Sequence, residues 1–148
     1  SIDIALGKYV ISSSAQYNPS TSKIVKKENS LTYTSNSRKF ITLSVSDEGT
    51  KETDKLYGAY PLTDSIHLFG ALDKTTSTGI TNSETTGVAY ESCCWAFRVA
   101  HFKTNDIVSG GYDYSTGFEL VLTGLGSTDS PLKGKIEDNI PGYTARLR

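Results

Sequence analysis

The stretch Val88-Ala-Tyr-Glu-Ser-Cys-Cys-Trp-Ala-Phe-Arg-Val-Ala-His-Phe102 is the only long apolar run of the chain and holds its one Trp and both Cys. If the run is a single strand, successive side chains point to opposite faces of a sheet. Trp95 and Phe97 then share one face, and Ala96 and Phe102 share the other. Because both faces are largely apolar, we expect this strand to be covered on both sides, with Trp95 and Phe97 buried.

Two further segments alternate apolar and polar residues in the manner of half-buried strands. Residues 40–46 place Ile41, Leu43 and Val45 on one face, and residues 118–124 place Phe118, Leu120 and Leu122 on one face, with Glu119 outward. We expect both apolar rows to face the core. Residues 143–148 alternate again and predict a closing strand.

The 148 residues are enough for one domain with a proper core, and their composition favours strand and turn over helix. Short strands joined by polar turns predict an all-β fold, an antiparallel β-sandwich of jelly-roll or fibre-head type with little helix. We expect residues 1–148 to form a single β-sandwich domain. Because the chain starts without Met, we interpret it as the head of a longer fibre or surface protein.

Residues 73–87 consist almost wholly of Thr, Ser, Gly, Asn and single charges. A segment with so little apolar material is poorly suited to a core, so it predicts a long surface loop. Long loops in compact domains are uncommon and often functional, which makes this one a candidate binding surface.

The adjacent Cys93 and Cys94 leave opposite faces of an extended strand and cannot bridge each other there without a strained turn. The chain holds no other Cys. We therefore expect both thiols to be unbridged and buried, in a protein that folds under reducing conditions.

Charge and motifs exclude several classes of function. The net charge of −1 argues against a nucleic-acid partner, and no run approaches the roughly 20 apolar residues of a spanning helix, so we expect no membrane insertion. The chain has no nucleophile elbow, no His-Glu-x-x-His, no Cys-x-x-Cys and no phosphate-binding loop. We predict no enzymatic activity, no catalytic residue, no metal site and no cofactor.

The segment Ser109-Gly-Gly-Tyr-Asp-Tyr-Ser-Thr-Gly117 predicts a loop with Gly at both ends and two Tyr between them. A Tyr ring offers a flat apolar face with a hydroxyl at its tip, and Asp, Ser and Thr supply directed hydrogen bonds. This combination suits a sugar or a protein contact. The alternative is that the two rings only close one end of the fold. The predicted ligand-binding residues are Asn105, Tyr112, Asp113, Tyr114, Ser115 and Thr116.

These features favour a non-enzymatic attachment module, the receptor- or glycan-binding head of a virus, phage or bacterial surface fibre. Its expected partners are a host glycan or protein receptor and further copies of itself, with a homotrimer favoured. The expected location is a virion surface or an extracellular appendage. The alternative is a structural subunit of a capsid, pilus or tail that has no soluble ligand.

Overall fold

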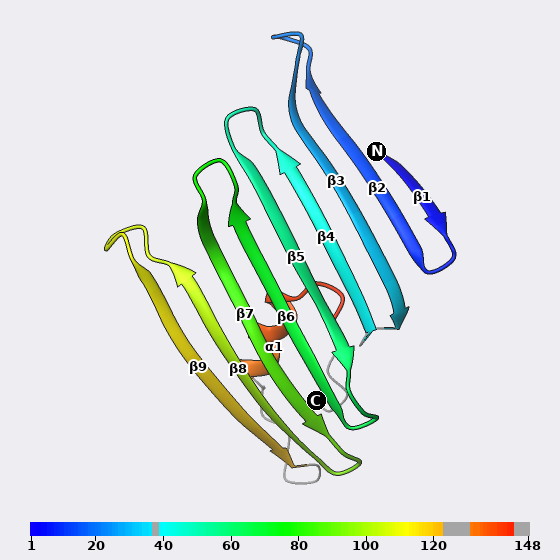
Figure 1. Cartoon of the computed structure of the whole chain (residues 1–148), viewed down its shortest axis with the longest axis vertical. Coiled ribbons are helices and arrows are strands. Elements are labelled where there is room, and N and C mark those ends of the chain that lie inside the picture. Colours follow the sequence, from blue (N-terminus) through cyan, green and yellow to red (C-terminus); the bar gives the residue numbers. More distant parts are fainter. Residues whose placement is uncertain (37–38, 123–130, 144–148) are drawn as a thin grey trace.

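The computed structural model describes residues 1–36, 39–122 and 131–143, in which nine strands form one antiparallel sheet (Figure 1). Each strand pairs with the next one along the chain, from β1 to β9. The strands are β1 (Ile2–Leu6), β2 (Tyr9–Asn18), β3 (Lys23–Asn36), β4 (Lys39–Asp47), β5 (Glu52–Pro61), β6 (Ile66–Thr75), β7 (Ile80–Glu91), β8 (Trp95–Asn105) and β9 (Tyr112–Leu122). Because β1 and β9 each pair on one side only, the described sheet is open at both edges.

The prediction of an all-β fold with little helix is confirmed, but the described residues contain one sheet and not the two of a sandwich. One face of the sheet is covered by helix α1 (Pro131–Asn139), which lies behind the middle strands in Figure 1. The prediction of one domain over residues 1–148 stays a prediction.

Helix α1 closes the hydrophobic core. It begins at Pro131, whose fixed φ and missing N–H suit the first helical position. Ile136 and Ile140 are fully buried, and Tyr143 follows them. They pack on apolar side chains of the sheet, namely Phe40, Ala59, Phe69, Ala89, Ala100 and Phe102.

The central apolar run is a hairpin, so the prediction of one continuous strand is wrong. β7 ends at Glu91, residues 92–94 turn, and β8 starts at Trp95. In the turn the Ser92 Oγ accepts hydrogen bonds from the backbone N–H groups of Cys94 and Trp95, both at 3.4 Å. Trp95 and Phe97 are each 40% exposed, which corrects the prediction that they are buried.

Residues 73–87 form a hairpin too, not a long loop. β6 continues to Thr75, four residues turn, and β7 starts at Ile80. Side-chain hydrogen bonds link the two strands: Asn82 Nδ2 donates to Asp73 Oδ1 and to Thr75 Oγ1, both at 2.9 Å. Polar residues form strands here because they bond to one another across the hairpin.

Both predicted core rows lie on the wrong side. Ile41 and Leu43 are 52% and 46% exposed, and Thr42 and Ser44 are buried instead. In β9 Phe118 and Leu120 are exposed, and Glu119 is directed into the protein. The strands were correctly predicted, but the side of the sheet that is covered was not. Of the predicted closing strand, residues 144–148 lie outside the described residues.

Candidate functional site

The sheet has two contrasting faces. We call the face packed against α1 the helix face, and the opposite face the open face. Directly paired residues of an antiparallel sheet share a face, so one row on the open face passes through Tyr33, Ile41, Gly58, Gly70, Thr86, His101 and Thr116. Every second residue from this row along each strand also belongs to the open face.

The open face is apolar although it is exposed. Its large hydrophobic members that stand exposed are Ile2, Ile4, Leu6, Tyr9, Ile11, Leu31, Ile41, Leu43, Leu56, Tyr60, Leu68, Val88, Trp95, Phe97, Tyr112, Tyr114, Phe118, Leu120 and Leu122. A soluble monomer rarely exposes a contiguous apolar patch larger than a few hundred Å². A surface of this extent therefore marks contact with another apolar phase or partner.

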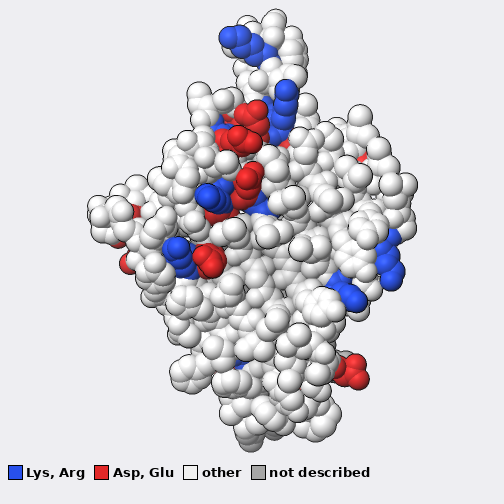
Figure 2. All heavy atoms as spheres, viewed as in Figure 1, with Lys and Arg blue, Asp and Glu red and all other residues white. Residues whose placement is uncertain are grey.

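Charged side chains border the apolar area on one side, toward the upper end in Figure 2. We measure the distance of this border from the row through Gly58 by counting residues along each strand toward the charged side. The first charged residue of the open face is six residues from the row on β3 and β4, four residues on β5 and β6, and two residues on β7 and β8. These residues are Lys27, Asp47, Asp54, Lys74, Glu84 and Lys103. The charged border thus crosses the strands obliquely.

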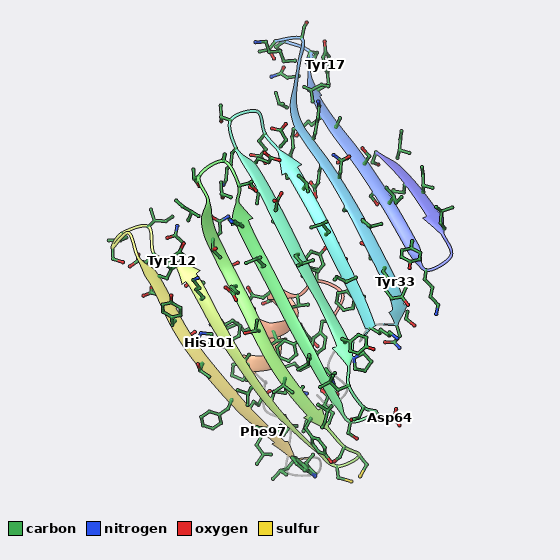
Figure 3. All side chains as sticks on the ribbon, in the orientation of Figure 1. Tyr17, Tyr33, Asp64, Phe97, His101 and Tyr112 are labelled. Atoms are coloured by element: carbon green, nitrogen blue, oxygen red, sulfur yellow. The ribbon has the colours of Figure 1, made fainter. Side chains whose placement is uncertain are left out.

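Aromatic side chains border the opposite side and follow the same oblique course. Tyr33 on β3 lies in the row through Gly58, and Tyr9 on β2 is paired with it. On the side away from the charges, Tyr60 lies two residues from this row, Tyr90 lies four residues from it and Trp95 lies six residues from it. Tyr90 and Trp95 pack together, with ring centroids 4.7 Å apart. Figure 3 shows this end of the sheet at Tyr33 and Phe97, and the other end at Tyr17 and Tyr112.

The two borders are nearly parallel, and this fixes the tilt of the strands. For every two strands crossed, roughly 9.6 Å across the sheet, both borders shift by about two residues, roughly 6.6 Å along the strand. The strands therefore cross the apolar band at about 35° from its normal. Between the borders lie about six residues of each strand, or about 20 Å along the strand, and the aromatic rings and lysine stems extend the apolar surface further.

The predicted ligand-binding residues lie on strands, which corrects the prediction of a loop. Tyr112 to Thr116 begin β9 and pair with the end of β8, where Asn105 is opposite Tyr112. Tyr112 and Tyr114 point to the open face; Lys103 Nζ lies 4.4 Å from the Tyr112 ring centroid. Asp113 and Ser115 alternate onto the helix face. Ligand binding by these six residues stays a prediction.

On the open face beside them, the His101 ring stacks against Tyr114, with centroids 6.0 Å apart. His101 Nδ1 and Thr116 Oγ1 are 2.8 Å apart, within hydrogen-bond distance. His101 thus connects Tyr114 and Thr116 of β9 on the open face, two residues from the charged border at Lys103.

The loop between β8 and β9 is residues 106–111, and Asp106 organises it. Its carboxylate accepts hydrogen bonds from the Ser109 hydroxyl and, at 2.9 Å, from the Val108 backbone N–H. These two bonds, the Ser109 bond first, hold the pKa of Asp106 below its ordinary range. The loop is thus closed by its own side chain.

Cys93 and Cys94 lie exposed in the turn between β7 and β8, and both are free thiols. The prediction that they are unbridged is confirmed, and the prediction that they are buried is wrong. The neighbouring Cys93 raises the pKa of the Cys94 thiol, through a side-chain hydrogen bond first and through charge repulsion second.

The helix face holds a buried ionic cluster that the sequence did not reveal. Arg98 is fully buried, with Nη1 2.8 Å from Glu119 Oε2 and Nη2 3.3 Å from Glu91 Oε1. His67 is buried on the same face and hydrogen-bonded to the Tyr143 hydroxyl. Arg98 and Glu119 are an opposite-charge pair at facing strand positions, a signal that needs the strand pairing to be known.

The residues that the structure describes contain no candidate metal cluster and no candidate membrane-spanning helix. No group of three or more His, Cys, Asp or Glu side chains there could hold a metal ion. No helix in the same residues combines the length and the apolar character needed to cross a membrane.

Comparison with models of known protein families finds no match. The chain is similar, however, to proteins named LPS-assembly protein LptD. The Legionella pneumophila (strain Lens) protein is 32% identical over 93 residues, which cover 60% of this chain and 11% of that protein. The Shewanella frigidimarina protein is 25% identical over 142 residues, or 81% of this chain and 18% of that protein, and the Coxiella burnetii protein is 33% identical over 78 residues, or 47% and 9%.

The chain therefore spans between about a tenth and a fifth of the length of these relatives. Similarity to these proteins overturns the predicted attachment head of a virus, phage or surface fibre and its alternative, a structural subunit of a capsid, pilus or tail. It also overturns the host glycan or receptor, the trimer, the location on a virion or appendage, and folding under reducing conditions. The prediction that the protein inserts into no membrane is overturned with them. The prediction that the protein is not an enzyme is confirmed, because the relatives are named for LPS assembly and not for a reaction.

Proposed function

We propose that this chain supplies a run of membrane-spanning strands to an LPS-assembly protein of the LptD kind in a bacterial outer membrane. The observation that carries the proposal is the apolar band of the open face, with its oblique charged and aromatic borders. Membrane-spanning strands tilt by about 35–45° and present an apolar band edged by aromatic residues. A tilt of about 35°, taken from the two borders, falls in that range.

In this proposal the open face contacts the acyl chains of lipids, and the helix face points to a polar interior. Strand length agrees, because β2 to β9 have 9 to 14 residues and a tilted spanning strand needs about 9–11. Exposed Ile and Leu side chains on the open face are then removed from water, and buried Thr and Ser side chains line the interior.

Within the described residues, the backbone groups of β1 and β9 that point away from the sheet meet no further strand. In lipid every backbone N–H and C=O must be paired within the protein. We therefore propose that β1 and β9 pair with further strands, so that the finer architecture is a closed sheet and not a sandwich.

Tyr112 and Tyr114 take a new role under this proposal. They lie on the open face at the charged border, with Lys103 against Tyr112 and His101 against Tyr114. Spanning sheets carry aromatic belts at both interfaces, and these two side chains supply the second belt, opposite Tyr33 and Tyr60.

The membrane role is tested with the native Trp95, which stands on the open face. In the protein reconstituted into bilayers, phospholipids brominated on their acyl chains should quench Trp95 fluorescence strongly, because the ring contacts lipid. Fluorescence that responds to the water-soluble quencher iodide but not to the brominated lipids would refute the membrane role.

The LPS role is tested by exchange. The stretch of Shewanella frigidimarina LptD that matches this chain is replaced by it in cells that depend on that protein, and LPS at the cell surface is measured. We expect surface LPS to be restored. A well-folded, membrane-inserted exchange protein that leaves surface LPS absent would contradict the assignment to LPS assembly.

A further inference from the structure

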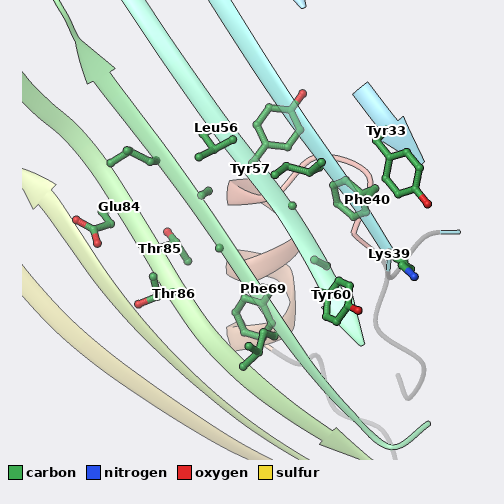
Figure 4. A pocket seen from close by; sticks show the side chains of 17 residues that line it. Tyr33, Lys39, Phe40, Leu56, Tyr57, Tyr60, Phe69, Glu84, Thr85 and Thr86 are labelled. Atoms are coloured by element: carbon green, nitrogen blue, oxygen red, sulfur yellow. The ribbon is translucent and has the colours of Figure 1, made fainter. Parts of the chain in front are cut away.

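The open face has a bowl in the middle of its apolar band, with a volume of about 640 Å³ (Figure 4). Its floor is the backbone of Gly58 and Gly70, which are directly paired between β5 and β6. Two residues away along the strands, Leu56 and Leu72 stand on one side of this floor. Tyr60 and Leu68 stand on the other side.

The bowl exists because two glycines meet where neighbouring positions carry large side chains. Ile41 on β4 and Thr86 on β7 close it across the strands. The bowl spans about four residues along the strands, or roughly 13 Å, and about three strand spacings across, or roughly 14 Å. A flexible hydrocarbon chain can fill such a hollow, whereas a flat bilayer surface would leave it unpacked.

One cation stands at the rim. Among the described residues that line the bowl, Lys39 is the only basic one, and its Nζ lies 5.3 Å from the Tyr60 ring centroid. It lies at the aromatic border, which the proposed function places at the depth of the lipid head groups. Glu84, an acidic residue among those that line the bowl, stands at the opposite rim and belongs to the charged border.

The aromatic border also lies at the end of the sheet with the shorter turns among the described residues. The turns at this end have two residues (7–8), four residues (62–65) and three residues (92–94). The turns at the other end have four residues (19–22, 48–51 and 76–79) or six residues (106–111). In outer-membrane sheets the short turns face the periplasm. Under the proposed function this end of the sheet lies in the periplasmic leaflet, which consists of phospholipids, so we expect a phospholipid beside Lys39.

We propose that the bowl over Gly58 and Gly70 binds one acyl chain of an anionic phospholipid, whose phosphate pairs with the Lys39 ammonium group. This inference rests on the proposed membrane role of the open face. It goes beyond that role, because it assigns one specific lipid site to a surface that otherwise contacts lipid without selection.

The test uses single Trp probes in a Trp95→Phe background, in bilayers of zwitterionic phosphatidylcholine with anionic phosphatidylglycerol. Leu68→Trp reports from the rim of the bowl, and Leu120→Trp reports from the open face outside it. Quenching by acyl-brominated forms of each lipid gives their relative binding constants. We expect the binding constant at residue 68 to be about fivefold higher for the anionic lipid than for the zwitterionic lipid, because one Lys near an anionic membrane surface contributes about 1 kcal/mol. At residue 120 we expect no preference.

Lysine variants test the rim. Lys39→Gln should abolish the preference at residue 68 and Lys39→Arg should retain it, whereas Lys8→Gln, in a turn at the same end, should leave it unchanged. Preference that survives Lys39→Gln would overturn the phosphate contact.

Filling the bowl tests the acyl-chain contact. At Gly70 an added Cβ meets only the Thr85 carbonyl oxygen, at 3.4 Å, so Gly70→Val leaves the backbone in place. Gly70→Val should weaken lipid quenching at residue 68, and Ala15→Val, elsewhere on the open face, should not.

The outcomes separate this inference from the proposed function. If both probes are quenched equally by both lipids, the bowl inference fails and the membrane role stands. A stronger preference for lipid A than for phospholipid at residue 68, or occupation by a protein partner that excludes all lipid there, also overturns it. If neither probe is quenched by any lipid, the membrane role fails first.

Discussion

On β4, Ile41 and Leu43 are 52% and 46% exposed on the open face, whereas Thr42 and Ser44 are 5% and 7% exposed on the helix face. The apolar side chains of this strand are thus outside and the polar ones inside. Thr42 is accommodated because its hydroxyl lies 3.0 Å from that of Thr32, within hydrogen-bond distance. Under the proposed function, the contrast teaches that the medium around the sheet, and not only its own core, determines which face is apolar.

The largest expected effect on the helix face is at Arg98. Arg98→Leu leaves Glu91 and Glu119 without the cation between them and should cost about 3–5 kcal/mol in free energy of unfolding. Urea unfolding of the reconstituted protein measures it. Lys55→Leu, which loses an exposed pair with Asp73 at 3.9 Å on the same face, should cost less than about 1 kcal/mol. Equal losses at the two sites would show that the helix face is not a buried interior.

The next effect concerns the contact of the helix with the sheet. Ile140→Ala removes a fully buried side chain that directly follows α1 in the core between helix and sheet, and should cost about 2–5 kcal/mol by the same unfolding assay. Ile24→Ala, at an exposed position of β3, should change stability by no more than about 0.5 kcal/mol. A loss at Ile140 as small as at Ile24 would mean that α1 does not pack on the helix face in solution.

The smallest effect lies outside both faces, in the loop that Asp106 closes. Because its pKa is lowered in the folded loop, the carboxylate stabilises the loop at any pH above its ordinary value of 3.8. That stabilisation is lost as the pH falls through the lowered pKa. Amide exchange at Val108 should therefore be slow at pH 6 and accelerate below pH 3.8 beyond its intrinsic pH dependence, and Asp106→Asn should be fast at both pH values. Slow exchange in Asp106→Asn would contradict this role.

Sequence patterns predicted several strands but not the orientation of the sheet. Alternation in residues 40–46 and 118–122 shows that two faces differ, and either face can be the covered one. Leu43 and Leu120 were predicted to lie in the core because the protein was expected to be surrounded by water. An oblique border of charges appears only when the pairing of distant strands is known, so the sequence alone could not reveal it.

Other features were missed for local reasons. Ser92 to Cys94 lack Gly and Pro, so the apolar run around them showed no turn signal. Asp73 to Gly87 looked like a loop because cross-strand bonding of polar residues leaves no apolar pattern. Helix α1 had a usable signal in Pro131 at its start and Gly142, at φ 87°, beyond its end.

The most direct test of the account compares two neighbours on β2, Ile11 on the open face and Ser12 on the helix face. In the bilayer-reconstituted protein, Ile11→Arg should cost about 2–4 kcal/mol in free energy of unfolding, because it places a charge in lipid. Ser12→Arg should cost little, because it faces a polar interior. Losses for Ile11→Arg and Ser12→Arg that agree within about 0.5 kcal/mol would contradict the central claim that the open face contacts lipid.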